Sequence, residues 1–303
     1  MDKINSIDIK VALFFSKCIN YYINKRTYVP LPPSNDKIWD SLFVTNDTIL
    51  HELKEGVKIK LYKSSILSKL IYFGFERAEL SFLTKFLKEG DTFIDIGSNI
   101  GLYSIYASDL VGERGRILAF EPTPEIFIRL CDNVQINGLL NIEPINMALS
   151  NKSDFVDFNV SLDGHDAWNS FAKLEELEMC KKIKVKVNTL DSFVDERRLD
   201  DINLIKVDVE GWEKFVLEGS RKLLSSEKSP VFIVEFTEKN AFAAGYYCGE
   251  LYDYIKTFGF NWYCYEESKN SLNPVEKKLH YPYENLFAIK DINACLNRIK
   301  KND

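Results

Sequence analysis

Short apolar runs alternate with segments of helical periodicity through most of the chain. Apolar runs at 117–120, 142–146, 204–207 and 231–234 predict buried strands. Between them, apolar residues recur at every third or fourth position, as in 122–137, which is typical of amphipathic helices. Strands that alternate with helices predict a doubly wound, mostly parallel α/β sheet.

Two later apolar runs, at 262–265 and 286–289, complete the predicted sheet. They are close enough in sequence to pair as a hairpin, so we expect the last strand to be antiparallel. The helical spacing predicts further helices at 76–87, 212–224 and 250–258.

Residues 155–189 interrupt this alternation of strands and helices. Apolar and polar residues alternate at 156–160 and again at 183–187, which predicts an antiparallel pair of strands. The connection between them contains His165. Because long excursions from a compact core are usually functional or mobile, we interpret this insertion as a lid over a site.

The first 75 residues predict an N-terminal helical and linker extension. Residues 7–23 have the spacing of a helix that packs on the main domain or on a second subunit; peripheral membrane contact is the alternative. Residues 28–36 contain three prolines and predict a linker. We expect the main domain at 76–295 and a tail at 296–303.

Composition narrows the class of protein. A chain of 303 residues can bury a large α/β core, and its formal net charge of −6 disfavours a general nucleic-acid binder. The six cysteines include no C-x-x-C pair and therefore predict reduced thiols. The opening residues lack a secretory signal, so we expect a cytoplasmic protein.

The segment 95–101, Asp-Ile-Gly-Ser-Asn-Ile-Gly, predicts a strand, a glycine turn and a helix. A dinucleotide fold requires G-x-G-x-x-G, whereas these glycines are four residues apart. Asp95 at the strand end would repel a pyrophosphate and attract a cation. The pattern resembles motif I of the S-adenosylmethionine-dependent methyltransferases, whose donor carries an ammonium and a sulfonium. The alternative is an ordinary turn whose glycines serve packing.

Two later strand ends supply further candidates for a nucleoside site. Glu121 ends the next strand, before Pro122, about 20 residues beyond the glycines, where an acid can accept hydrogen bonds from both ribose hydroxyls. A solvated loop carboxylate is the alternative. Asn146, Met147 and Ala148 follow the third strand, and in this superfamily the corresponding loop borders the adenine. Simple strand termination is the other interpretation of this loop.

Five motifs together resemble the FkbM family of methyltransferases in order and spacing. They are 95–101, 120–122, 189–191, 206–211 with Glu213, and 234–235. The resemblance covers about 77–290. It implies a Rossmann-like class I methyltransferase fold and S-adenosylmethionine-dependent O-methylation of a sugar, glycan or natural-product hydroxyl. The donor-binding residues that we expect are Asp95, Gly97, Ser98, Asn99, Gly101, Glu121, Pro122, Asn146, Met147, Ala148 and Asp208.

Acidic residues at the ends of the fourth and fifth strands are candidates for the base that removes the hydroxyl proton. Asp208, Glu210 and Glu235 occupy these ends, and His165 in the insertion is a further candidate. Three carboxylates near one hydroxyl also suit Mg²⁺, but we predict a site without metal. The family often has a Gly/Ser-rich insertion, whereas this one contains Trp168 and Asn169, so the acceptor stays open.

Other function classes fit the motifs less well. An amine methylase of nucleic acid usually has Asn- or Asp-Pro-Pro-aromatic after the fourth strand, where this chain has Asp-Val-Glu-Gly at 208–211. The glycine spacing disfavours a dehydrogenase. A non-catalytic partner protein that binds the donor and uses its N-terminal segment as an interaction surface is the remaining alternative. Either form is compatible with a homo-oligomer.

Overall fold

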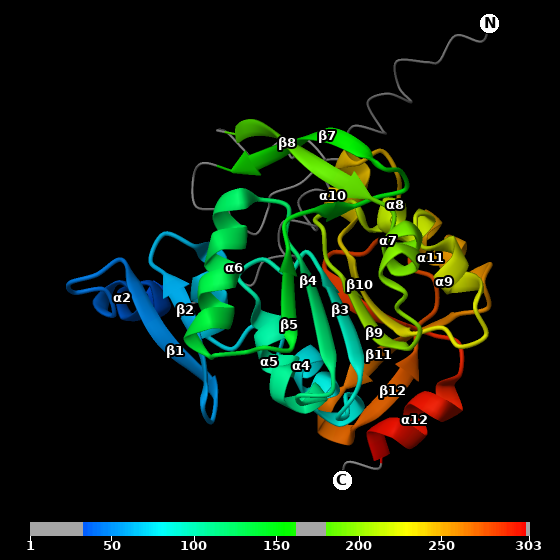
Figure 1. Ribbon diagram of the computed structural model, residues 1–303, viewed down its shortest axis with the longest axis horizontal. Coiled ribbons are helices and arrows are strands. Elements are labelled where there is room, and N and C mark those ends of the chain that lie inside the picture. Colours follow the sequence, from blue (N-terminus) through cyan, green and yellow to red (C-terminus); the bar gives the residue numbers. More distant parts are fainter. Residues whose placement is uncertain (1–32, 162–179, 301–303) are drawn as a thin grey trace, which may run out of the picture. The chain divides into compact units, whose positions relative to one another are not determined.

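The computed structural model describes residues 33–161 and 180–300 (Figure 1). The chain divides into two compact units, 1–41 and 42–303. In the first, the described residues form helix α2 (Pro33–Ser41). The linker prediction for 28–36 is therefore wrong from Pro33 onward, because proline is compatible with the first turn of a helix. The helix predicted at 7–23 lies outside the described residues.

An eight-stranded sheet forms the centre of the second unit. Its strand order is β12 (Ser271–Pro274), β11 (Asn261–Glu266), β13 (Glu284–Ile289), β10 (Val231–Phe236), β9 (Ile202–Val207), β3 (Thr92–Ile96), β4 (Arg116–Phe120) and β5 (Ile142–Ile145). The strands from β5 to β10 are parallel, and β13 is antiparallel to both β10 and β11. The predicted Rossmann-like α/β class with an antiparallel last strand is confirmed.

Helices cover both faces of this sheet (Figure 1). The chain moves from β3 through β4 to β5 in one direction and from β9 to β10 in the other. Right-handed crossovers therefore place the connecting helices of the two halves on opposite faces. One group comprises α4 (Arg77–Phe86), α5 (Leu102–Val111), α6 (Pro124–Ile136) and α12 (Ile292–Lys300); the other comprises α7 (Leu190–Arg197), α8 (Glu213–Glu218), α9 (Arg221–Ser225) and α11 (Cys248–Lys256).

The continuous helix predicted at 212–224 is wrong, because the chain forms α8 and α9 with a break at Gly219 and Ser220. A Cβ atom on Gly219 would lie 2.1 Å from the backbone oxygen of Ser150. The Gly219 carbonyl also accepts a hydrogen bond from the Asp191 backbone N–H, at 3.0 Å. Close packing on a neighbouring backbone thus interrupts the helix, and helical periodicity does not reveal such contacts.

Two smaller sheets accompany the central one. In the first, β7 (Asp154–Ser161) pairs antiparallel with β8 (Cys180–Asn188), which confirms the strand pair predicted in the insertion, and β6 (Ala148–Leu149) pairs parallel with β8. Its function as a lid stays a prediction. In the second, β1 (Thr48–Lys54) and β2 (Val57–Tyr62) form a hairpin.

Two side chains connect the hairpin of β1 and β2 to α6, one within that helix and one directly after it. The backbone N–H groups of Lys60 and Lys58 donate to the side-chain oxygens of Asn133 and Asn137, at 2.7 and 2.8 Å. Three further short elements complete the unit, namely α3 (Ile66–Tyr72), α10 (Glu238–Ala243) and the 3₁₀ turn η2 (Glu267–Lys269). The predicted division of the chain at residue 76 stays a prediction.

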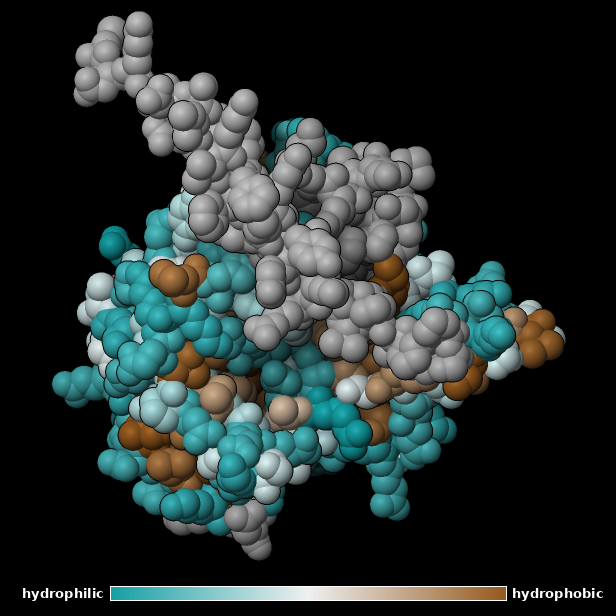
Figure 2. Space-filling model, turned by 180° about the vertical axis from the view of Figure 1, so that it is seen from behind, coloured by the Kyte–Doolittle hydropathy of each residue, from teal (hydrophilic) through white to brown (hydrophobic). Residues whose placement is uncertain are grey.

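The surface of the described residues carries no extended hydrophobic band on the face that Figure 2 shows, where hydrophobic patches are separated by hydrophilic surface. Single exposed apolar side chains such as Leu140 and Phe242 are ordinary in globular proteins. None of the helices within 33–161 and 180–300 combines the length and the hydropathy that a membrane span requires.

Replacing Phe82 in α4 with alanine is expected to lower the free energy of unfolding by about 3–5 kcal/mol. Phe82 is fully buried, and its ring lies 4.6 Å from that of Phe287 and 5.2 Å from that of Phe86. Urea unfolding followed by circular dichroism measures the change. Leu140→Ala, at a fully exposed position, serves as the control and should change stability by less than about 0.5 kcal/mol.

Candidate functional site

The carboxyl ends of β3, β4, β9 and β10 meet at one edge of the sheet, since these strands are parallel. The strand order switches direction at β3, and doubly wound sheets bind ligands beside such a switch. The predicted site residues at the ends of β3, β4, β5, β9 and β10, or in the segments that follow these ends, are Asp95, Gly97, Ser98, Asn99, Gly101, Glu121, Pro122, Asn146, Met147, Ala148, Asp208, Glu210 and Glu235. His165 lies outside the described residues.

The glycine turn after β3 is packed against two neighbouring strands. The backbone N–H groups of Gly97 and Ser98 donate to the Phe120 carbonyl at 3.0 and 2.9 Å, and the N–H of Gly101 donates to the Ser98 carbonyl at 2.8 Å. Gly97 has a φ of +82°, and a Cβ there would lie 1.8 Å from the backbone oxygen of Asp208. Packing inside the protein therefore requires this glycine, whether or not a ligand binds.

Asp95 lies inside the domain, with 1% of its surface exposed. Its Oδ2 accepts a hydrogen bond from the Ser104 hydroxyl at 2.6 Å, while its Oδ1 has no partner. Burial raises the pKa of Asp95 to about 6, although Lys206, opposite it in β9, acts in the other direction. The Asp95 carboxyl group thus contributes to the electrostatic potential at this edge of the sheet.

Glu121 is buried at the end of β4 and stabilises the glycine turn through hydrogen bonds. Its two carboxylate oxygens accept hydrogen bonds from the backbone N–H groups of Asn99, at 3.1 Å, and of Thr123, at 2.8 Å. Asn99 itself adopts a left-handed conformation with a φ of +48°. A carboxylate has about four acceptor sites in all, so a glutamate can accept more hydrogen bonds than these two.

The loop after β5 is tied to the Glu121 segment. The Asn146 side-chain amide donates to the carbonyls of Glu121 and Pro122, at 2.8 and 3.1 Å. Met147 and Ala148 are both buried. The candidate ribose and adenine residues therefore form one connected segment of the edge.

Asp208 is bonded to a buried lysine that the sequence analysis did not select. The Asp208 Oδ2 atom lies 2.5 Å from Nζ of Lys206, whose ammonium also lies 4.3 Å above the Tyr103 ring. Burial by itself would lower the pKa of Lys206, but the Asp208, Glu76 and Asp95 carboxylates raise it, so the ammonium stays charged. The signal that could have revealed this buried ion pair is a lysine within the apolar run 204–207.

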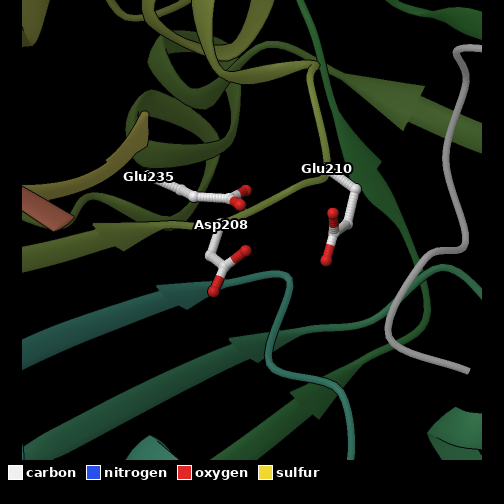
Figure 3. A group of neighbouring side chains, drawn as sticks. All are labelled: Asp208, Glu210 and Glu235. Carbon is white, nitrogen blue, oxygen red and sulfur yellow. The ribbon is translucent and has the colours of Figure 1, made fainter. Parts of the chain in front are cut away.

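The carboxyl groups of Asp208, Glu210 and Glu235 converge (Figure 3), and one oxygen of each lies within 4.8 Å of the others. Asp208 and Glu210 are partly buried, whereas Glu235 is buried. Burial and mutual repulsion raise the pKa values of Glu210 and Glu235 well above their ordinary range. The predicted strand-end acids therefore form one cluster.

Neighbouring side chains hold two of these acids in place. The Asn240 amide donates to Glu210 Oε2 at 2.6 Å, and the Thr237 hydroxyl donates to Glu235 Oε1 at 2.7 Å. Glu210 has a φ of +53°, a conformation that is uncommon for residues other than glycine. The sequence offered no signal for Asn240, because α10 was not predicted.

Glu213 shapes the loop that carries Asp208 and Glu210. Its Oε1 accepts hydrogen bonds from the Val209 and Gly211 N–H groups, both at 3.0 Å, and its Oε2 accepts one from the Tyr246 hydroxyl at 3.1 Å. Burial raises the pKa of Glu213 to about 7, although the two backbone donors oppose the shift. Glu213 thus stabilises the loop geometry through hydrogen bonds to two of its backbone N–H groups.

Replacing Glu213 with alanine is expected to lower the free energy of unfolding by about 2–3 kcal/mol, because two loop N–H groups lose their acceptor. Glu213→Gln keeps an acceptor oxygen of the same reach, and its amide can donate to Tyr246, so it should retain most of the stability. Urea unfolding of both variants measures the difference. Equal losses in the two variants would show that the hydrogen bonds to the loop are not what stabilises it.

Residues 95–261 match the family model described as the Methyltransferase FkbM domain, which is more than half of the chain. A hexuronic acid methyltransferase from Haloferax volcanii, AglP, is 28% identical over 151 residues, covering 50% of this chain and 59% of the relative. A 2-O-methyltransferase from Sinorhizobium fredii, NoeI, is 24% identical over 183 residues, covering 56% of this chain and 73% of the relative.

The matched region spans 59% of the length of the Haloferax relative, which is less than two thirds. Among solved structures, methyltransferase FkbM from Methylobacillus flagellatus is similar with a TM-score of 0.40 and 13% identity. This similarity covers 73% of the chain and 54% of the solved structure.

Proposed function

Because the chain belongs to the FkbM methyltransferase domain family, we propose that it transfers the methyl group of S-adenosylmethionine to a hydroxyl of a sugar or natural product. The observation that carries the proposal is the convergence of Asp208, Glu210 and Glu235 beside the glycine turn. This edge lies at the switch in strand order, where a doubly wound fold places its ligand.

We assign the donor to the segment between the glycine turn and the loop after β5. Glu121 would accept hydrogen bonds from the ribose hydroxyls, and Met147 would border the adenine. The backbone contacts of Glu121 with Asn99 and Thr123 support this assignment, because they fix the carboxylate before the donor arrives. A ligand group that meets a preorganised partner loses less free energy on binding.

The acceptor hydroxyl would then face the carboxylate cluster. Its oxygen attacks the methyl carbon, the S–CH₃ bond breaks as the O–CH₃ bond forms, and S-adenosylhomocysteine leaves. The hydroxyl proton passes to the carboxylate of Asp208 or Glu210. Alignment of donor and acceptor supplies much of the rate enhancement in such a displacement, and the base adds a factor of about 10²–10⁴.

The names of the relatives support oxygen as the acceptor atom and a sugar as the acceptor class. One is named for hexuronic acid and another for 2-O-methylation. A hexuronic acid offers both hydroxyl groups and a carboxyl group, so methyl transfer to it yields either an ether or an ester. We propose the ether.

The test is transfer of a radiolabelled methyl group to hexuronic acids, neutral oligosaccharides and an extract of the native host, followed by mass spectrometry. We expect label in a saccharide or natural product that survives mild alkali, because methyl ethers are stable where methyl esters release methanol. Alkali-labile label would contradict the hydroxyl acceptor, and label in nucleic acid would contradict the substrate class. Binding of donor without transfer to any acceptor would favour the non-catalytic alternative.

A further inference from the structure

We infer that Asp208, Glu210 and Glu235 form a binding site for a divalent cation, with Mg²⁺ as the ion that suits it best. The sequence favoured a site without metal. Geometry, the unpaired buried oxygens, the hydrogen-bond partners of each acid and the charge of the cluster point to the alternative.

The three acids present oxygen atoms to a common point. They come from two neighbouring parallel strands, Asp208 and Glu210 from the loop after β9 and Glu235 from the end of β10. Figure 3 shows the three carboxyl groups close together, and one oxygen of each lies within 4.8 Å of the other two. Oxygens that coordinate one Mg²⁺ at 2.0–2.1 Å are at most about 4.2 Å apart, so small side-chain rotations would bring these into coordination.

A buried acceptor in the cluster has no partner. Glu235 is 4% exposed, and its Oε2 atom makes no hydrogen bond although its Oε1 accepts one from Thr237. Asn285 lies directly opposite Glu235 in the pair of β10 and β13, so the two side chains share a face. Its Oδ1 is also buried without a partner. Two buried oxygens without a hydrogen-bond partner call for a donor or a cation.

Each of the three acids contacts a donor group of a neighbouring side chain. Lys206 contacts Asp208, Asn240 contacts Glu210 and Thr237 contacts Glu235. Hydrogen bonds of this kind orient carboxylates that coordinate metals.

The charge of the cluster matches that of a divalent ion. With the three acids ionised and Lys206 protonated, two net negative charges remain in a mostly buried place. Buried charges of one sign are costly unless a counter-ion neutralises them. Mg²⁺ prefers carboxylate oxygens and keeps several coordination positions for water or substrate.

One consequence rests on the proposed function. An acceptor hydroxyl that took one of the remaining coordination positions would be fixed next to the methyl group, and the cation would lower the pKa of that hydroxyl. The acids would then position the acceptor through the ion, and the proton would pass to a neighbouring carboxylate or to water.

The test is titration of the full chain with MnCl₂ after removal of metals with a chelating resin, with free Mn²⁺ followed by electron paramagnetic resonance. We expect one saturable site that MgCl₂ competes for. Glu235→Gln and Glu210→Gln should each weaken Mn²⁺ binding at least about tenfold. Glu196→Gln, at an exposed position on α7, is the matched control and should bind Mn²⁺ like the unchanged chain.

Absence of a saturable Mn²⁺ site, or unchanged affinity in both glutamine variants, would overturn the inference. Circular dichroism and titration with S-adenosylmethionine on the same samples check that each variant is folded. Methyl transfer that persists in EDTA would contradict a part for the cation in the reaction and leave the proposed function intact. Saturable Mn²⁺ binding at these residues without any methyl transfer would support the cation site and contradict the proposed function.

Discussion

Replacing Glu121 with alanine is expected to weaken the binding of S-adenosylmethionine at least about 100-fold. Hydrogen bonds to a charged group contribute about 1.5–3 kcal/mol each, and the proposed ribose contact contains two. The substitution also removes the acceptor for the N–H groups of Asn99 and Thr123, so the glycine turn loses support. Isothermal titration calorimetry with the donor measures the dissociation constant.

Two further variants make the Glu121 result interpretable. Glu121→Gln keeps an acceptor oxygen and should weaken binding less than Glu121→Ala does. Glu125→Ala removes an exposed acid of α6 four residues away and should leave the affinity unchanged. Donor binding that is equally tight in Glu121→Ala and in the unchanged chain would exclude Glu121 from the ribose site.

Replacing Glu210 with glutamine is expected to lower kcat by a factor of about 10²–10⁴ while donor affinity changes less than twofold. The amide keeps the size of the side chain and an acceptor for Asn240, but it loses the charge that faces the proposed acceptor. Steady-state kinetics with the acceptor found in the labelling experiment, together with calorimetry for the donor, separates the two effects.

Glu196→Gln again serves as the control for Glu210→Gln, because Glu196 lies on the exposed surface of α7. It should keep full activity. A Glu210→Gln variant that turns over at the rate of the unchanged chain would show that this carboxylate takes no part in the transfer.

Hydrophobic periodicity was sufficient for the central sheet except its edge strand β12, because strands buried on both faces form short apolar runs that few other structures produce. The order of strands and helices then placed Asp208 and Glu235 at the same edge, since the ends of parallel strands must lie together. Convergence of these acids therefore followed from topology, and the structure adds the distances and the partners of each carboxyl group.

Features that depend on contacts between residues far apart in the sequence could not be predicted from hydrophobic periodicity. The break at Gly219 arises from the Ser150 backbone, and the contact of Asn240 with Glu210 joins α10 to the loop after β9. The requirement for Gly97 comes from Asp208, more than a hundred residues later. Pro33 illustrates a local error, since proline ends some helices and begins others.

A crystal structure of the chain with S-adenosylhomocysteine tests the central claim most directly. We predict that the ribose hydroxyls lie within hydrogen-bonding distance of Glu121, with the adenine beside Met147 and the sulfur directed toward Asp208 and Glu210. A nucleoside bound away from this edge of the sheet, or a ribose without contact to Glu121, would contradict it.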